Sequence, residues 1–128
     1  MGNLKENQQR VENGTFYTVL QIDIAKSAER ILTADISRRE SIKKIAERLS
    51  VSETSLKNYF RGVFGQNISD YLRDIRMNTA AGLLTETQIS ISEISTQVGY
   101  VNQGKFAIVF KKQFGLSPLE YRRSRRLD

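Results

Sequence analysis

The sequence has no cysteine and no histidine among its 128 residues, and it contains a single proline. Without cysteine it forms neither a disulfide nor a thiolate metal site, and without histidine it lacks the commonest general base and metal ligand. It also has no glycine-rich phosphate loop and no aspartate-rich calcium loop. Catalysis would have to depend on a pair of carboxylates alone, so we expect no enzyme and no cofactor.

Long hydrophobic runs are missing as well. No stretch approaches 18 consecutive apolar residues, and the N-terminus lacks the charged-then-apolar pattern of a secretory signal. We therefore expect the chain in the cytoplasm, with no membrane partner. The apolar fraction of 39% is enough to build a core, and the scarcity of strand-like alternation favours an all-α fold.

Acidic side chains are too few to balance the basic ones, and the net charge is +6. Residues 1–40 hold six basic and six acidic side chains, whereas residues 41–85 and residues 86–128 each hold seven basic and four acidic ones. The excess positive charge therefore lies after residue 40. An ordinary soluble surface and a polyanion-binding surface are both compatible with it.

The most informative feature of the chain is an internal repeat. Residues 41–49 (SIKKIAERL) align with residues 90–98 (SISEISTQV) at an offset of 49 positions, and one inserted residue then changes the offset to 50. In the second register the matching pairs are Leu56 and Phe106, Phe60 and Phe110, Phe64 and Phe114, Gly65 and Gly115, and Tyr71 and Tyr121. Apolar, aromatic and glycine positions rarely match in one common register by chance. We therefore predict that the chain contains two copies of one structural unit.

Each copy has the pattern of a short helix, a tight turn and a second helix. Ser41 and Ser90 are the expected N-caps of the short helices, and Ser52 and Asn102 those of the second helices. The apolar positions of the second helices recur at helical spacing, on Leu56, Tyr59, Phe60 and Phe64 or on Phe106, Val109, Phe110 and Phe114. Gly65 and Gly115 then occur where a left-handed C-terminal cap is needed. This pattern is typical of a helix-turn-helix.

A long helix is predicted between the copies, capped by Asn67 and ending at about Leu84. It carries two apolar stripes, the first on Ile68, Tyr71, Leu72 and Ile75 and the second on Met77, Ala80, Ala81 and Leu84. At about 100° per residue the stripes lie on opposite sides, so the helix can dock one unit at each end. The expected organisation is a polar tail or linker over 1–15, a first helix-turn-helix over 16–66, the linker helix over 67–84 and a second helix-turn-helix over 85–128, with about seven helices.

The two ends of the predicted fold are less regular. A first helix is expected over residues 16–33, and a strand through Val19 and Ile24 is the alternative. Residues 1–14 are polar and end in an Asn13-Gly14 turn signal. The last helix should begin at Ser117-Pro118, with Glu120 completing a capping box, and it ends among arginines that suit the negative end of the helix dipole.

The segment from Gly99 to Arg122 (GYVNQGKFAIVFKKQFGLSPLEYR) resembles the second helix-turn-helix signature of the AraC/XylS family of bacterial transcription regulators. Residues 71–76 (YLRDIR) with Ala80 are similar to the linker helix of that family, and the whole resemblance covers about residues 20–126. It implies sequence-specific binding of double-stranded DNA, usually to activate transcription. Most members have an upstream sensory or dimerisation domain, and the polar N-terminus here favours a C-terminal piece of such a protein over a natural short one.

In a helix-turn-helix the second helix enters the major groove and presents its outward side chains to the bases. The resemblance places base contacts of the first copy at Thr54, Lys57 and Asn58. In the second copy only Gln103 and Lys105 are suited to base reading, because Gly104, Ala107 and Ile108 form no side-chain hydrogen bonds. For Ile108 two interpretations are open, contact with a thymine methyl group and packing against the neighbouring helix, and we expect the packing.

Phosphate contacts are expected at helix N-termini, whose backbone N–H groups attract anions, and at basic side chains. The N-terminal candidates are Ser41, Ser52, Ser90, Asn102 and Ser117, and the side-chain candidates are Arg61, Lys111, Lys112 and Arg122. Arg76 is a further candidate, with a structural ion pair to a carboxylate as its alternative. The alternative function is an adaptor that binds protein, such as a subunit of RNA polymerase, with DNA contact secondary.

Overall fold

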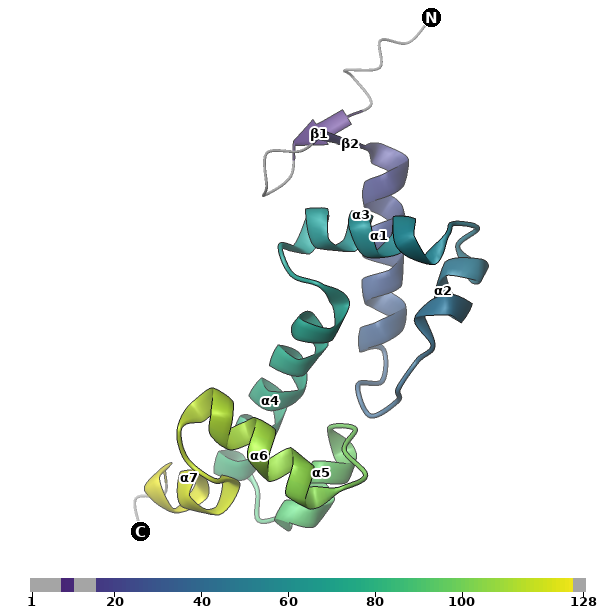
Figure 1. Cartoon of the computed structure of the whole chain (residues 1–128). Helices are drawn as coiled ribbons and strands as arrows, with labels where there is room; N and C mark the ends of the chain where they lie inside the picture. Colours follow the sequence, from purple (N-terminus) through teal and green to yellow (C-terminus); the bar gives the residue numbers. More distant parts are fainter. Residues whose placement is uncertain (1–7, 11–15, 126–128) are drawn as a thin grey trace, which may run out of the picture. The chain divides into compact units, whose positions relative to one another are not determined.

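The computed structural model describes residues 8–10 and 16–125 of the chain. Over these residues it has seven α-helices and two strands of three residues each (Figure 1). The prediction of an all-α fold with two helix-turn-helix motifs and a long helix between them is confirmed, and the short pair of strands is an addition to it. The turn expected at Asn13-Gly14 lies outside the described residues.

Residue contacts divide the chain into two compact units. The first holds Met1–Asp35 and Glu40–Leu72, and the second holds Ile36–Arg39 and Arg73–Asp128. The division falls inside the long helix α4 (Ile68–Glu86). Each unit is described by itself below.

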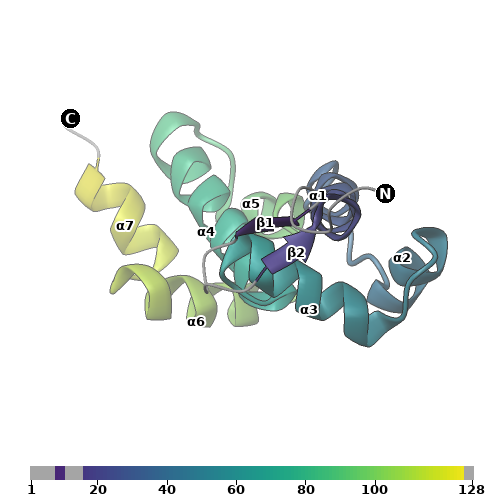
Figure 2. The ribbon, with the colours of Figure 1, turned by 90° about the horizontal axis from the view of Figure 1, so that it is seen from above.

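The first unit opens with an antiparallel pair of strands, β1 (Gln8–Arg10) and β2 (Phe16–Thr18), in which Gln9 lies opposite Tyr17. The two strands lie side by side in both ribbon views (Figures 1 and 2). The helix α1 (Val19–Thr33) follows at once, so residues 19–24 are helical and the strand interpretation of that segment is wrong. The helix begins three residues later than predicted because Thr18 and Gln21 form a capping box. The Gln21 N–H donates to Thr18 Oγ1 at 3.1 Å, and the Thr18 N–H donates to Gln21 Oε1 at 3.0 Å.

Helix α1 packs with α2 (Ile42–Arg48), α3 (Glu53–Phe64) and the start of α4 around one apolar core. Its buried members are Ala28, Leu32, Ile45, Ala46, Leu56, Phe60, Ile68 and Leu72. The second unit has its own core, built by the rest of α4, α5 (Ile91–Gln97) and α6 (Gln103–Phe114), with α7 (Pro118–Arg125) against it. Its buried members are Met77, Ala80, Ala81, Leu84, Ile94, Val98, Tyr100, Phe106 and Phe110.

The two apolar stripes predicted on α4 serve different cores. Ile68 and Leu72 belong to the core of the first unit, whereas Met77, Ala81 and Leu84 belong to that of the second. Asn67 caps the helix as expected, since its Oδ1 accepts a hydrogen bond from the Asp70 N–H at 2.8 Å. A single helix thus takes part in two separate hydrophobic clusters because its apolar face changes side partway along.

The repeat in the sequence is matched by a repeat in the packing. In the first unit the Phe60 ring lies 4.6 Å from the Phe64 ring and 5.2 Å from that of Tyr71, between centroids. In the second unit the corresponding distances, from Phe110 to Phe114 and to Tyr121, are again 4.6 and 5.2 Å. The second contact of each set is edge-to-face, a favoured arrangement of aromatic rings.

No helix in the described part of the chain combines the length and the apolar character that a membrane span requires.

Candidate nucleic-acid interface

The turn between the two helices of each motif is held by the same backbone hydrogen bond. The Val51 N–H donates to the Ala46 carbonyl at 3.0 Å, and the Tyr100 N–H donates to the Ser95 carbonyl at 2.9 Å. The turns also share a residue of positive φ, Ser50 at 59° in the first and Gly99 at 90° in the second. The sharp turn from α2 to α3 is therefore repeated between α5 and α6.

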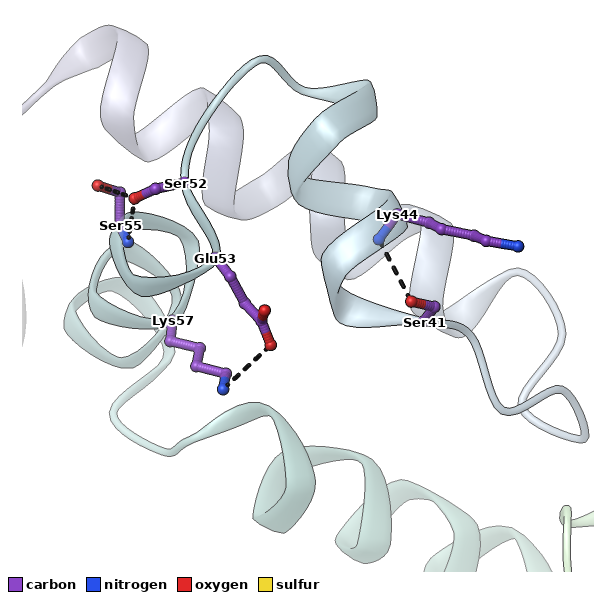
Figure 3. A network of polar contacts seen from close by, with 6 residues as sticks. All are labelled: Ser41, Lys44, Ser52, Glu53, Ser55 and Lys57. Carbon is purple, nitrogen blue, oxygen red and sulfur yellow. Dashed lines mark hydrogen bonds and ion pairs between the residues drawn. The ribbon is translucent and has the colours of Figure 1, made fainter.

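All five polar residues predicted at helix N-termini act as caps. Ser52 Oγ accepts from the Ser55 N–H at 3.0 Å, and Asn102 Oδ1 accepts from the Lys105 N–H at 3.0 Å. The corresponding bonds of Ser41, Ser90 and Ser117 are 3.1 to 3.3 Å long (Figure 3 shows those of Ser41 and Ser52). Each cap satisfies one N–H of a first turn, which leaves further N–H groups without intrahelical partners. The contact of these caps with phosphate stays a prediction.

The capping box predicted at the last helix is confirmed. Ser117 Oγ accepts from the Glu120 N–H, and Glu120 Oε1 accepts from the Ser117 N–H at 3.0 Å. The hydrogen bonds that the Ser117 backbone N–H and side chain make to the Glu120 carboxyl lower the pKa of that carboxyl below its usual value. At Ser90 the hydroxyl oxygen accepts from the Glu93 N–H at 3.1 Å, a cap without the second bond of a capping box.

The outer side of α3 carries the predicted reading residues of the first unit. Thr54, Lys57, Asn58 and Arg61 are all exposed. Lys57 Nζ lies 3.3 Å from Glu53 Oε1, one turn earlier on the same helix (Figure 3). The two side chains are 60% and 44% exposed, so the ion pair is a surface pair of about 0.3–0.5 kcal/mol that a phosphate or a base can displace.

Asn58 has a partner that the sequence did not indicate. The phenol of Tyr17 donates to Asn58 Oδ1 at 3.4 Å. The Tyr17 ring is buried against α3, where a Cβ atom on Gly62 would overlap it. Gly62 lies inside α3, in its last turn, and a glycine within a helix is a signal of close packing that could have predicted a partner at this position.

The outer side of α6 differs in character from that of α3. Gln103, Lys105, Lys111 and Lys112 are exposed, in keeping with contact to DNA. Ile108 is 71% exposed, so the expectation that it packs against a neighbouring helix is wrong. The reason is geometric, because Phe106 and Phe110 occupy the core side of α6 and Ile108 lies midway between them, about 200° from each.

Arg122 has a structural role in the second unit. Its guanidinium donates to three backbone carbonyls, those of Leu84 at 3.0 Å, Ile89 at 2.7 Å and Thr87 at 3.4 Å. These bonds satisfy carbonyl groups at and beyond the C-terminal end of α4, where cations are favoured. The geometry thus gives no support to the phosphate contact predicted for Arg122.

Arg76 is also structural. It is buried, and its Nε donates to the carbonyl of Ile36 at 3.0 Å, so its partner is a backbone carbonyl rather than the expected carboxylate. Burial and the nearby charge of Arg39 lower the pKa of Arg76. Arg39 in turn donates to the Gly99 carbonyl at 3.0 Å and lies over the Tyr100 ring. The two arginines thus attach residues 36–39 to α4 and to the turn between α5 and α6.

The described residues contain no group of three or more acidic side chains that could hold a metal ion. What the two units offer in common is a pair of exposed, mainly polar or basic helix faces, on α3 and α6, each following a tight turn.

Comparisons with known proteins agree with this geometry. A family model described as a helix-turn-helix domain matches residues 45–124. The chain is 31% identical over 96 residues to the HTH-type transcriptional activator RhaR of Enterobacter sp. (strain 638), a match that covers 74% of this chain and 34% of the relative. It is 33% identical over 91 residues to RhaR of Escherichia coli (strain K12), covering 71% of this chain and 32% of the relative. The chain thus spans about a third of the length of these curated relatives.

Solved structures show the same fold. The C-terminal domain of AraT, a response regulator from Geobacillus stearothermophilus, superposes with a TM-score of 0.76 at 35% identity, covering 82% of this chain and 88% of that one. An AraC-type transcriptional regulator from Chromobacterium violaceum gives 0.68 at 28% identity, covering 84% and 93%. The DNA-binding domain of AdpA, solved in complex with a target DNA, gives 0.74 at 22% identity, covering 80% and 92%.

The fold and the paired helix faces define a DNA-binding domain of the tandem helix-turn-helix type, and the family that it matches is one of transcription regulators and not of enzymes. The chain belongs to the AraC/XylS family of bacterial transcription regulators, of which it carries the DNA-binding domain.

Proposed function

We propose that the chain binds specific sites on duplex DNA with α3 and α6 in adjacent major grooves, as a monomer on an asymmetric site. The observation that carries the proposal is the repeated geometry of two helix-turn-helix units whose second helices present different exposed side chains. A helix of this type fits the major groove, and successive grooves on one face of DNA are about 34–36 Å apart. Because the two faces differ in sequence, the two half-sites differ as well.

The base contacts of the first half-site are assigned to Thr54, Lys57 and Asn58. An asparagine amide pairs with adenine through two hydrogen bonds, and lysine reaches the acceptors of guanine. In the second half-site Gln103 and Lys105 are the polar readers. All five side chains are exposed and stand on the outer sides of α3 and α6.

Phosphate contacts are assigned to the first turns that begin at Ser41, Ser52, Ser90, Asn102 and Ser117, and to Arg61, Lys111 and Lys112. The first turns offer backbone N–H donors for a phosphate oxygen, and the exposed basic side chains in the last turns of α3 and α6 offer positive charge. Arg122 is left out of this set because its guanidinium already donates hydrogen bonds to three backbone carbonyls.

We further propose that the complete protein activates transcription, in the bacterial cytoplasm and on the nucleoid. The relatives at 31% and 33% identity are described as transcriptional activators, and this supports activation over repression. Since those relatives are about three times as long as the matched region, we assign sensing or dimerisation to an upstream domain. Contact with RNA polymerase is the direct route from a bound domain to activation.

The test is a selection of bound sequences from a random duplex pool, followed by titration of the enriched site at several salt concentrations. If about 5–8 phosphates are neutralised, log K should fall against log salt with a slope of about −4 to −8. An equal preference for single-stranded RNA, or a slope near zero, would contradict DNA binding. Capture of RNA polymerase without any enriched DNA sequence would favour the adaptor function instead.

A further inference from the structure

The outer side of α6 holds an apolar group that the core does not use. Ile108 is 71% exposed, and Val101, in the turn immediately before the helix, is fully exposed at 105%. Ala107 stands beside Ile108 and is half-buried. A large aliphatic side chain left in water forgoes the free energy of burial, so a cluster of them on a candidate binding face calls for a partner.

The position of Ile108 in the repeat is informative. At the offset of 50 it corresponds to Asn58 of α3, while Ala107 corresponds to Lys57 and Gly104 to Thr54. The same scaffold therefore carries hydrogen-bonding side chains at three positions in one unit and none at those positions in the other. At these three positions the polar side chains of α3 are replaced in α6 by a glycine and two apolar residues, while the caps and the core of the motif are retained.

The surroundings of Ile108 indicate which partner it suits. The same helix exposes three lysines, Lys105, Lys111 and Lys112, so positive charge surrounds the apolar group. A partner that is polyanionic and also offers small apolar groups at fixed positions is duplex DNA, whose major groove exposes the C5 methyl groups of thymine. A protein partner of an aliphatic patch would not require the lysines.

Gly104 adds a steric argument. It lies one turn before Ile108 on the same side of α6, and it has no side chain to hold the helix away from a surface. Its side toward solvent is open, since a Cβ atom there would meet only Asn102 Oδ1, at 3.1 Å. The backbone of the first turn can therefore approach the bases closely, which brings Ile108 within reach of the groove floor.

We propose that Ile108, with Val101 beside it, selects thymine in the second half-site by contact with the thymine methyl group. The inference rests on the proposed DNA binding and adds the chemical group that α6 recognises. The preference is for the methyl group and not for a pattern of hydrogen bonds, so it should be modest at each position and should depend on the methyl group alone.

The experiment replaces single thymines by deoxyuridines in the selected duplex, which removes only the methyl group. In the second half-site, one or two such replacements should weaken binding of the whole chain about three- to five-fold, the value of one buried methyl-sized group. Replacements in the first half-site, read by α3, serve as the control on the DNA and should change affinity less.

The control on the protein uses two exposed aliphatic side chains. Ile108→Ala should lose the distinction between thymine and uracil, while Leu119→Ala, on α7 and 43% exposed, should keep it. Both variants should melt as the parent does, because neither side chain is in a core. Equal affinity for thymine and uracil throughout the second half-site, with the selected site still bound tightly, would overturn this inference and leave the proposed function intact. Failure to bind any duplex would overturn both.

Discussion

Tyr17 reaches the reading helix of the first unit, where its phenol donates to Asn58 Oδ1 at 3.4 Å. The ring packs over Gly62 and meets Tyr59 edge-on, with 6.0 Å between centroids. An asparagine that pairs with adenine must present both its oxygen and its nitrogen in the right order. The hydrogen bond from Tyr17 favours one orientation of the amide before DNA arrives, and the oxygen retains a second lone pair for the base.

Replacing Tyr17 by Phe should therefore reduce the preference for adenine at the base pair assigned to Asn58, by about 0.5–1 kcal/mol, with little change in melting temperature. The matched control is Tyr59→Phe, which removes the bond from Gln21 Nε2 to the Tyr59 hydroxyl at 3.3 Å and leaves Asn58 untouched. Titration against single-base variants of the site measures both effects. Identical base preferences in Tyr17→Phe and the parent would show that the hydrogen bond does not orient the amide.

Phe60 and Phe110 are completely buried at equivalent positions of two separate cores. Replacing either by Ala should lower the free energy of unfolding by about 3–5 kcal/mol. Because each phenylalanine belongs to one core only, hydrogen exchange should accelerate first in the unit that carries the substitution. Nearly unchanged melting of both variants would be incompatible with this packing.

Most of the fold could be predicted because the signals are local and occur twice. Each of these signals depends on a few neighbouring residues: the helical spacing, polar caps such as Ser52 and Asn102, and the left-handed glycines Gly65 and Gly115. Each signal also recurs in the second copy, at an offset of 49 or 50 residues, and this recurrence supports it. Apolar spacing alone places the start of α1 three residues too early, whereas the Thr18–Gln21 capping box, whose T-x-x-Q spacing is visible in the sequence, sets the start at Val19.

What could not be predicted depends on contacts between distant residues. The sequence does not show that Tyr17 forms a hydrogen bond with Asn58, 41 residues later. Nor does it show that Arg122 donates hydrogen bonds to backbone carbonyls 33 to 38 residues earlier. Ile108 illustrates a different difficulty, since an isoleucine on a helix is most often buried and only packing decides which side of the helix faces the core. The candidate site was thus predictable as a helix face, and the role of a single side chain on that face was not.

The ion pair of Glu53 with Lys57 places a carboxylate on the outer side of α3. Glu53→Gln should free Lys57 and remove repulsion of the phosphates, so affinity for all duplexes should rise about two- to five-fold at low salt and less at high salt. Asp23→Asn makes the same change of charge on the exposed side of α1 and serves as the control. Equal effects of the two substitutions would indicate that only net charge matters and that Lys57 is not restrained by its neighbour.

The two units should divide the work of recognition unequally. The first offers three side chains that are able to form hydrogen bonds with bases, and the second presents Gly104, Ala107 and Ile108 at the corresponding positions, so sharp base preferences should come mainly from the first half-site. Asn58→Ala should make the free energy of binding to the preferred site less favourable by about 1–3 kcal/mol and relax the preference at one base pair.

Lys112→Ala should weaken binding to all sequences about equally and make the salt slope shallower by about one, because it removes a phosphate contact. Titration of the parent and both variants over single-base changes across the two half-sites separates these effects. Base preferences that are equally sharp in both half-sites, or confined to the second, would contradict this division and assign specificity to α6.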